Sequence, residues 1–189
     1  MLLEIKKSIL LLLVFTFLTG IIYPLLITGV AQLFFSFSAN GSLIERDGKI
    51  IGSWLIGQSF TEEKYFWGRP SATSSYSYNA LQSSGSNLAP LNPALLSAIK
   101  HRAEILQQAD PQNHHAIPVD LVTASASGLD PHISVASALY QAPRIARARH
   151  LSPAQVEALI HHQTKNSVCN LLGAPRINVL QLNMTLDDL

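Results

Sequence analysis

The stretch Ile9–Phe35, with the sequence ILLLLVFTFLTGIIYPLLITGVAQLFF, decides how this chain is organised. It runs for 27 residues without a charged side chain, and about 20 apolar residues suffice for a helix to cross the hydrocarbon core of a bilayer. Gly20, Pro24 and Gly29 would weaken a soluble helix, but a membrane helix tolerates them because lipid offers its backbone no competing hydrogen-bond partner. The sequence therefore predicts one transmembrane helix, preceded by a short N-terminal segment over residues 1–8.

A cleaved signal peptide is the alternative interpretation of the same stretch. The apolar core of such a peptide usually covers about 7–15 residues and ends at a small-residue cleavage site. The apolar run here is longer, and the residues Ser36–Ala39 make a poor cleavage site. A retained membrane anchor is therefore the favoured interpretation.

Basic residues near the ends of the helix predict its orientation, because cytoplasmic flanks carry an excess of lysine and arginine. Lys6 and Lys7 precede the helix together with the terminal amine, whereas the first basic residue after it is Arg46. This bias favours a cytoplasmic N-terminus. The soluble residues 36–189 would then lie outside the cytoplasm, in the periplasm of a bacterial cell with an outer membrane.

The composition limits what the rest of the chain can form. With 189 residues and 48% hydrophobic content, the chain holds one modest domain besides the helix. Lys plus Arg number 13 and Asp plus Glu number 12, so the net charge of +1 gives no general attraction to nucleic acid. The single cysteine, Cys169, can form neither an internal disulfide nor a cysteine-based metal site.

Two features at the start of the soluble domain predict a hairpin and a long loop. Asp47-Gly48 lies between two apolar-flanked runs, which is a strong hairpin signal because glycine accepts positive φ. Tyr65–Pro93 has no steady period and carries seven serines between Ser71 and Ser86. Its aromatic start favours a loop docked on the domain, since disordered segments are poor in aromatic residues.

Three proline-containing pairs predict helix starts. In each, a capping side chain precedes a proline: Asn92-Pro93, Asp130-Pro131 and Ser152-Pro153. The cap accepts an unpaired backbone N–H, and proline at the first helical position loses no hydrogen bond. The helices after the first and last starts carry apolar residues at helical spacing, namely Leu95, Leu96, Ile99 and Leu106, and Val156, Leu159 and Ile160.

Two short apolar segments predict strands between and after these helices. They are Pro118–Ser125, PVDLVTAS, and Ile177–Asn183, INVLQLN. Together the elements predict an α+β fold class, in which a single N-terminal transmembrane helix is followed by one mixed α/β soluble domain.

The segment Thr123–Ser134, TASASGLDPHIS, contains the residue types of a hydrolase triad in Ser127, Asp130 and His132. A triad usually draws its residues from distant parts of a chain, and the G-x-S-x-G pattern of a nucleophile elbow is absent around Ser127. A capped turn with Asp130 as the helix cap is therefore favoured, with no catalytic residue. A membrane-anchored hydrolase and a ligand-binding module built on the serine-rich loop stay open as alternatives.

Other polar clusters carry weaker signals. The pairs His114-His115 and His161-His162 do not converge on one metal ion if they lie on helices, because adjacent helical residues point about 100° apart. No phosphate-binding glycine motif is present. Three arginines in QAPRIARARH indicate either a stabilised helix end or a surface for an acidic partner or an anion; they are Arg144, Arg147 and Arg149.

After the apolar helix, seven motifs follow one another along the chain. They are GQSF (Gly57 to Phe60), YFWGRPSAT (Tyr65 to Thr73), YN (Tyr78-Asn79), SSGSNL (Ser83 to Leu88), VTASASGLDPHIS (Val122 to Ser134), QAPRIARAR (Gln141 to Arg149) and LGAPRINVLQLN (Leu172 to Asn183). In this order they resemble a known family, the C subunit of the potassium-transporting Kdp ATPase. The chain departs from the family at Ala174, where an acidic residue is usual.

The resemblance implies an accessory subunit of an ATP-driven potassium uptake complex in the bacterial inner membrane. Its partners would be a channel-like subunit, a P-type ATPase subunit and membrane lipid. It would be needed for assembly and act as a catalytic chaperone that raises the affinity for ATP. No tightly bound cofactor is implied, because ATP and potassium act through the complex. A family glutamine proposed to touch the nucleotide matches Gln141. Direct contact conflicts with the predicted topology, because ATP is cytoplasmic.

Candidate partner contacts follow from the helix and from the shared motifs. Gly20 and Gly29, with Thr28, suit close helix–helix contact in lipid. The candidates in the soluble domain are Trp67, Arg69, Asp130, Arg144 and Arg147.

Overall fold

A computed structural model of the chain describes residues 2–166 and 173–189. The chain divides into two compact units, Met1–Ile51 and Gly52–Leu189. Each unit is described separately below, and Cys169 lies outside the described residues.

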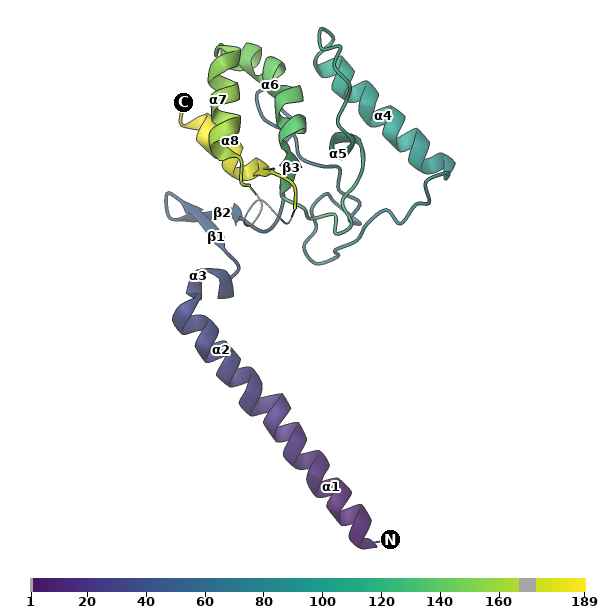
Figure 1. Ribbon diagram of the computed structural model, residues 1–189, viewed down its shortest axis with the longest axis vertical. Helices are drawn as coiled ribbons and strands as arrows, with labels where there is room; N and C mark the ends of the chain where they lie inside the picture. The colour runs from purple at the N-terminus through teal and green to yellow at the C-terminus, as the bar shows by residue number, and fades with distance from the viewer. Residues whose placement is uncertain (1, 167–172) are drawn as a thin grey trace. The chain divides into compact units, whose positions relative to one another are not determined.

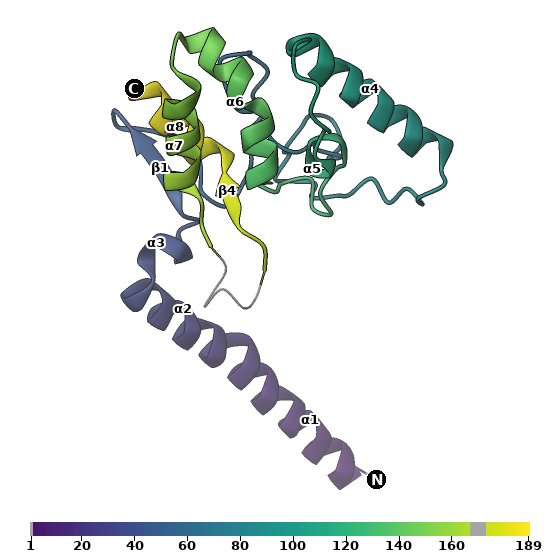
Figure 2. The same cartoon turned by 45° about the horizontal axis from the view of Figure 1, so that its top comes forward.

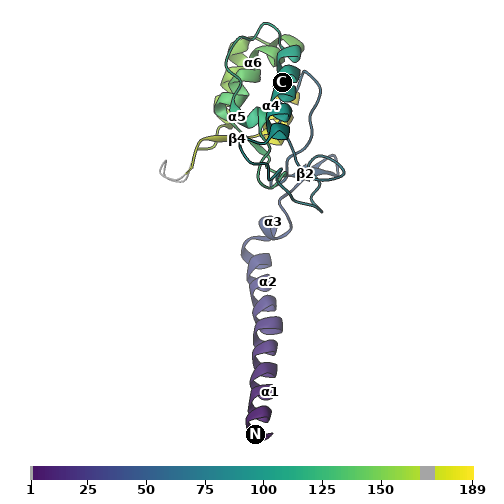
Figure 3. The same ribbon diagram turned by 90° about the vertical axis from the view of Figure 1, so that its right-hand side faces the viewer.

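The first unit is dominated by an unbroken helix with three consecutive parts (Figure 3). They are α1 (Leu2–Phe17), the π-helical turn η1 (Leu18–Ile22) and α2 (Tyr23–Phe34). None of their described residues is buried. The 33-residue helix is long and apolar enough to cross a membrane, since at about 1.5 Å per residue it exceeds the roughly 30 Å of a bilayer core. The predicted single apolar helix is confirmed, although it begins seven residues earlier than Ile9.

The wide turn at η1 ends at Ile22, two residues before Pro24. Proline has no N–H to donate, and its ring crowds the carbonyl four residues earlier, which here belongs to Gly20. A π-helical turn relieves that crowding without ending the helix. This explains how one helix runs through Pro24.

A short helix and a hairpin follow. They are α3 (Ser36–Ala39), β1 (Leu43–Arg46) and β2 (Lys49–Ser53). Asp47 and Gly48 have φ values of 53° and 73°, and positive φ at both central residues is the mark of a type I′ hairpin turn. The predicted hairpin is confirmed.

The main core of the second unit lies among three helices and a two-stranded sheet. α6 (Val135–Arg149), α7 (Pro153–Gln163) and α8 (Val179–Asp187) lie side by side in Figures 1 and 2. β3 (His132–Ser134) pairs antiparallel with β4 (Arg176–Asn178), with Ile133 opposite Ile177. The buried apolar residues are Phe66, Ile133, Ala138, Ala142, Ile145, Ala146, Val156, Leu159, Ile160, Ile177, Val179, Leu182 and Leu186.

A second, smaller cluster joins the remaining helices to α6. α4 (Pro93–Ala109) and the one-turn helix α5 (Val119–Val122) supply Leu106, Leu121 and Val122, which pack with Tyr140 of α6. The predicted starts of α4 and α7 are confirmed. Asn92 accepts from the Ala94 N–H, and Ser152 forms a capping box with Gln155. Leu96 is an exception to the predicted apolar face of α4, because it is 57% exposed.

Three other sequence predictions are wrong. Residues 118–125 contain the helical turn α5 and then an irregular loop. In Ile177–Asn183, the strand ends at Asn178, whose side chain caps α8 by accepting from the Gln181 N–H. The buried residues of α8 are spaced three and four apart, which is a helical period and not that of a strand. The third error is the helix start at Asp130-Pro131, because α6 begins after Ser134.

Candidate functional site

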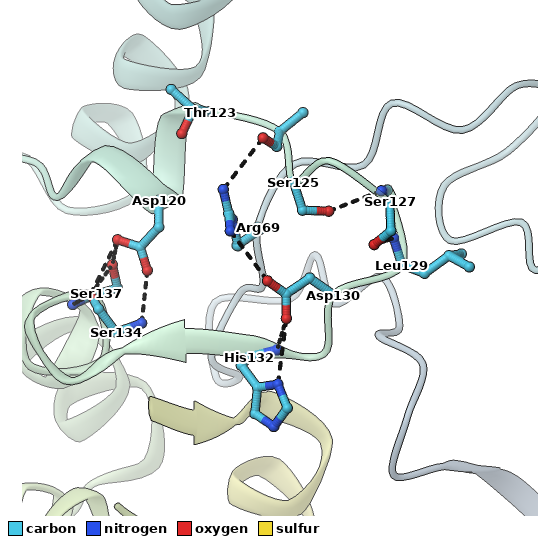
Figure 4. Close-up of polar contacts among 12 residues, drawn as sticks. Arg69, Asp120, Thr123, Ser125, Ser127, Leu129, Asp130, His132, Ser134 and Ser137 are labelled. Atoms are coloured by element: carbon cyan, nitrogen blue, oxygen red, sulfur yellow. Dashed lines mark hydrogen bonds and ion pairs between the residues drawn. The ribbon is translucent and has the colours of Figure 1, made fainter. Parts of the chain in front are cut away.

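The segment Thr123–Ser134 does not form a catalytic triad. The Ser127 hydroxyl accepts from the Leu129 N–H at 3.1 Å. Figure 4 shows it on the loop, apart from the carboxylate of Asp130 and the ring of His132. Within the described residues, His132 contacts Asp130 (Nδ1 to Oδ1, 3.4 Å) and has no hydrogen bond with Ser127. The structure therefore brings together two of the three residues and leaves the serine out.

Asp130 has a different structural role from the predicted helix cap. It accepts from the His132 N–H at 3.0 Å and pairs with Arg69 at 3.2 Å. Pro131 O accepts from the Val179 N–H, so by antiparallel alternation the backbone groups of His132 and Ser134 point away from β4. Asp130 therefore caps the free edge of β3 and does not cap a helix.

A second carboxylate completes this edge. Asp120 of α5 accepts from the Ser134 N–H at 2.7 Å and also from the hydroxyls of Ser134 and Ser137 (Figure 4). Unpaired strand edges invite pairing with other chains, and side chains that occupy the edge prevent it. The sequence analysis missed Asp120, because nothing in the local pattern indicates that α5 meets the start of α6.

The electrostatics of the Asp130 site follow from its neighbours. Burial by itself would raise the pKa of Asp130, but hydrogen bonds from His132 and the positive charge of Arg69 outweigh burial and lower that pKa below its usual value. Burial, aided by the charge of Asp130, raises the pKa of Tyr78 to about 12. The Tyr78 hydroxyl therefore stays neutral, and it donates to the Arg69 carbonyl at 2.6 Å.

The other side of the Thr123–Asp130 segment supports the serine-rich loop. The Ser127 carbonyl accepts from the Ser84 N–H and the Ser83 hydroxyl, each at 3.0 Å. The Gly128 carbonyl accepts from the Ser71 hydroxyl at 2.8 Å. Gly128 has φ of 68°, and a Cβ there would lie 2.6 Å from the Ser84 carbonyl oxygen, so only glycine fits. TASASGLD is thus a platform for the loop.

Two buried side-chain amides hold the aromatic start of the loop. Asn183 accepts from the Phe66 N–H at 2.8 Å and donates to its carbonyl at 3.0 Å. Gln141 does the same for Trp67, at 2.8 Å and 3.1 Å. Each side-chain amide therefore pairs with the N–H and the carbonyl of one loop residue, as the backbone of a neighbouring strand would do. The sequence analysis missed Asn183, although a polar residue on the buried face of α8 was the available signal.

Gln141 has used its hydrogen-bonding capacity. Its amide nitrogen also donates to the Ser137 carbonyl, and its oxygen also accepts from Arg144 at 2.9 Å. The residue is 1% exposed. Two donated and two accepted bonds complete the capacity of a primary amide, so a nucleotide contact at Gln141 would have to replace one of them. That contact stays a prediction.

The three arginines of α6 contact carbonyl or carboxylate groups of their own domain. Arg144 is 4% exposed, lies 4.3 Å above the Trp67 ring, and donates to the carbonyls of Glu63 and Tyr65. Burial lowers the pKa of its guanidinium to about 10. Arg147 pairs with Asp110, and Arg149 pairs with Asp187.

The remaining candidates differ in accessibility. Trp67 is partly buried and donates from its indole to the Glu62 carbonyl at 3.0 Å. The side chain of Arg69 is 25% exposed and that of Arg147 is 50% exposed. A Cβ added at Gly20 or Gly29 would meet nothing within 4 Å, so both positions are open on the helix surface. The partner roles of these residues stay predictions.

The domain also contains a pocket beside the serine-rich loop. The start of the serine-rich loop lines a pocket of about 260 Å³ with Trp67, Arg69 and Tyr78. Tyr78 is already hydrogen bonded inside the domain. Among residues 2–166 and 173–189, no three His, Cys, Asp or Glu side chains come together to hold a metal ion.

These features define a class of protein: a chain with one helix long enough to span a membrane, followed by a mixed α/β domain whose conspicuous polar residues hold a long loop. Residues 5–188 match the family model described as KdpC, the c chain of the K+-transporting ATPase. The chain belongs to the KdpC family.

Curated relatives agree with this assignment. The chain is 58% identical over 184 residues to the potassium-transporting ATPase KdpC subunit of Methylococcus capsulatus, covering 97% of each chain. It is 55% identical over 183 residues to that of Dechloromonas aromatica, covering 97% of this chain and 96% of the relative. The corresponding protein of Serratia proteamaculans is 54% identical over 185 residues, covering 98% of each chain.

Proposed function

We propose that this chain is an accessory subunit of a potassium-transporting ATPase that is needed for assembly of the complex and raises the affinity of its ATPase subunit for ATP. The observation that carries the proposal is the family match over residues 5–188, which includes both the helix and the domain. The partners are a channel-like subunit and a P-type ATPase subunit in the same bacterial inner membrane.

The helix supports a partner within the bilayer. Gly20, Thr28 and Gly29 are small or polar residues on a helix none of whose described residues is buried. Without a hydrophobic driving force in lipid, helices associate through small residues that let backbones approach. The helix therefore both anchors the domain and contacts a neighbouring membrane helix.

Co-purification tests the assembly role. The tagged full chain, extracted in mild detergent, is expected to bring with it a channel-like protein and a P-type ATPase. Recovery of a lone, stable monomer would contradict the proposal. The effect on nucleotide affinity is measured as the KM for ATP of the complex with and without this chain, and the KM is expected to be lower with it.

The proposed orientation places the domain outside the cytoplasm. It rests on Lys6 and Lys7 before the helix and on the absence of basic residues after it until Arg46. A reporter that is active only outside the cytoplasm, fused after Leu189, is expected to be active. Activity of a cytoplasm-only reporter at the same position would overturn this orientation and favour direct ATP contact at Gln141.

The anchored hydrolase is the weaker alternative, because Ser127 is not hydrogen bonded to His132 in the described part of the chain. In the assembled complex, Ser127→Ala is expected to leave the potassium-dependent ATPase activity nearly unchanged. Loss of activity in a fully assembled complex would restore a chemical role for that hydroxyl.

A further inference from the structure

A long part of the soluble domain carries no charge. From Pro70 to Ile99, 30 consecutive residues include no Asp, Glu, Lys, Arg or His. We call this segment the uncharged stretch. Charged residues flank it closely, with Arg69 before it and Lys100 after it. Water-exposed loops normally contain charged side chains, so their complete absence over this length calls for a physical reason.

Burial does not supply that reason, because leucines of the uncharged stretch face solvent. Leu81 is 90% exposed, Leu91 89% and Leu96 57%. Tyr76, in the same stretch, is 60% exposed. A leucine gains about 1.5–3 kcal/mol when it is fully buried, and these side chains do not obtain that gain within the chain. The exposed apolar groups thus belong to a segment that has no charged side chain of its own.

The uncharged stretch is nevertheless held in a defined conformation. Its serines donate to the platform carbonyls of Ser127 and Gly128, as described above. Asn79 is 4% exposed, and its N–H donates to the Thr73 hydroxyl at 3.1 Å. Three non-glycine residues of the uncharged stretch have positive φ, which costs conformational energy. They are Ser75, Tyr78 and Asn87. The loop therefore presents its leucines in a preorganised arrangement.

We propose that the uncharged stretch is a docking surface for an uncharged, apolar surface of another protein subunit in the same complex. This inference rests on the proposed function, which supplies a complex with other subunits. The centre of a protein–protein interface is depleted of charged residues and contains apolar anchors. A charged residue of the partner would lose its water on binding and would find no opposite charge in the uncharged stretch. An uncharged partner surface avoids this cost.

Charge and composition favour a protein over lipid. Segments that bind a membrane surface combine apolar residues with Lys or Arg for anionic headgroups. The uncharged stretch has apolar residues but no Lys and no Arg. The serines do not argue against a protein interface, because Ser71, Ser83 and Ser84 are committed to bonds inside the domain. Leu81, Leu91 and Leu96 are left to make the contact.

Photo-crosslinking in native membranes tests the proposal. A photoreactive amino acid replaces Leu81 or Leu91 in the full chain, expressed with the subunits that co-purify with it. Leu55 is the matched control, because it is 61% exposed in the same domain but lies outside the uncharged stretch. The expected result is an adduct of this chain with another protein subunit at Leu81 and Leu91, in yield about tenfold above that at Leu55.

Three results would overturn the proposal: adducts with lipid alone, adducts with a second copy of this chain alone, or equal yields at all three positions. Failure of the proposed function is seen separately, because then no other subunit co-purifies with the unmodified chain. As a second measurement, Leu91→Asp is expected to weaken recovery of the partner about tenfold, since a charge is buried there without a partner, whereas Leu55→Asp leaves recovery unchanged. Equal recovery with both variants would also overturn it.

Discussion

The region from Tyr65 to Ile99, which covers the long loop and the start of α4, has two parts that contact the rest of the domain in opposite ways. In Tyr65–Trp67, Phe66 is 0% exposed, and the amides of Asn183 and Gln141 hold the backbone from inside the core. In the uncharged stretch, Leu81 is 90% exposed, and the loop is held by its own hydrogen bonds and by backbone carbonyls of the platform. Neither part contains a strand before α4 begins at Pro93.

The difference shows that irregular backbone has two separate uses in this domain. The aromatic part belongs to the core through Phe66, which packs among α6, α8 and the sheet, and buried amides satisfy the polar groups of its backbone. The uncharged stretch is surface that is kept in shape. Substitutions in the first part should therefore act on folding, and substitutions in the second part should act on assembly.

The largest effect is expected for Phe66→Ala. Truncation of a fully buried phenylalanine costs about 3–5 kcal/mol, through lost transfer free energy and the cavity that remains. The free energy of unfolding of the detergent-solubilised chain can be followed by tryptophan fluorescence, since Trp54 and Trp67 both lie in the second unit. A loss below about 1 kcal/mol would show that this part of the loop is not core.

The next largest effect is expected for the two amides. Gln141→Ala and Asn183→Ala each leave an N–H and a carbonyl of the loop backbone without partners, which costs about 2–4 kcal/mol at about 1–2 kcal/mol for each group. Asn183→Ala is the matched control for the nucleotide hypothesis. If both variants destabilise alike but only Gln141→Ala raises the KM for ATP of the assembled complex, Gln141 has a role in nucleotide affinity beyond folding.

Local signals allowed much of the fold to be predicted. The apolar helix follows from composition alone, the hairpin from Asp47-Gly48, and two helix starts from a capping residue before proline. Each depends on residues that are neighbours in the chain. The docked aromatic part also follows, because three consecutive aromatic residues are unfavourable in solvent.

The candidate site was less predictable, because its contacts join distant residues. Asp130-Pro131 has the sequence of a helix start, yet the strand β3 follows it. One side of β3 pairs with β4, and on its other side Asp130 and Asp120 accept the N–H groups of His132 and Ser134. The amides of Gln141 and Asn183 reach residues that are 74 and 117 positions away. No local pattern specifies such contacts. The lack of charge from Pro70 to Ile99, by contrast, can be read directly from the sequence, although the sequence analysis above did not use it.

A moderate effect is expected at the platform, which joins the two kinds of region. Asp130→Ala removes the acceptor for the His132 N–H and the partner of Arg69, and we expect a loss of about 1–2 kcal/mol. Asp130→Asn keeps an acceptor for that N–H but loses the charge, so its loss should be smaller. Equal losses for the two variants would assign the whole effect to the ion pair.

A smaller effect of Asp130, on how the free energy of unfolding depends on pH, is also expected. Because the pKa of Asp130 is lowered in the folded state, its contribution is fully present above the ordinary carboxyl pKa of about 4 and is lost as the pH falls through the folded value. Between about pH 5 and pH 2, the wild-type chain should therefore lose more stability than Asp130→Asn does. Parallel pH profiles for the two proteins would contradict the lowered pKa.

The smallest effect on the free energy of unfolding is expected for the exposed leucines of the uncharged stretch, although their substitution is as drastic as that of Phe66. Leu81→Asn and Leu91→Asn replace leucines that are 90% and 89% exposed, and exposed substitutions of this kind change the free energy of unfolding by less than about 0.5 kcal/mol. The measurement is the same fluorescence-monitored unfolding as for Phe66→Ala. A loss above about 1 kcal/mol at either leucine would mean that the uncharged stretch packs against its own domain. Unchanged stability combined with weaker recovery of the partner subunits would separate assembly from folding, because the leucines would then gain their burial only in the complex.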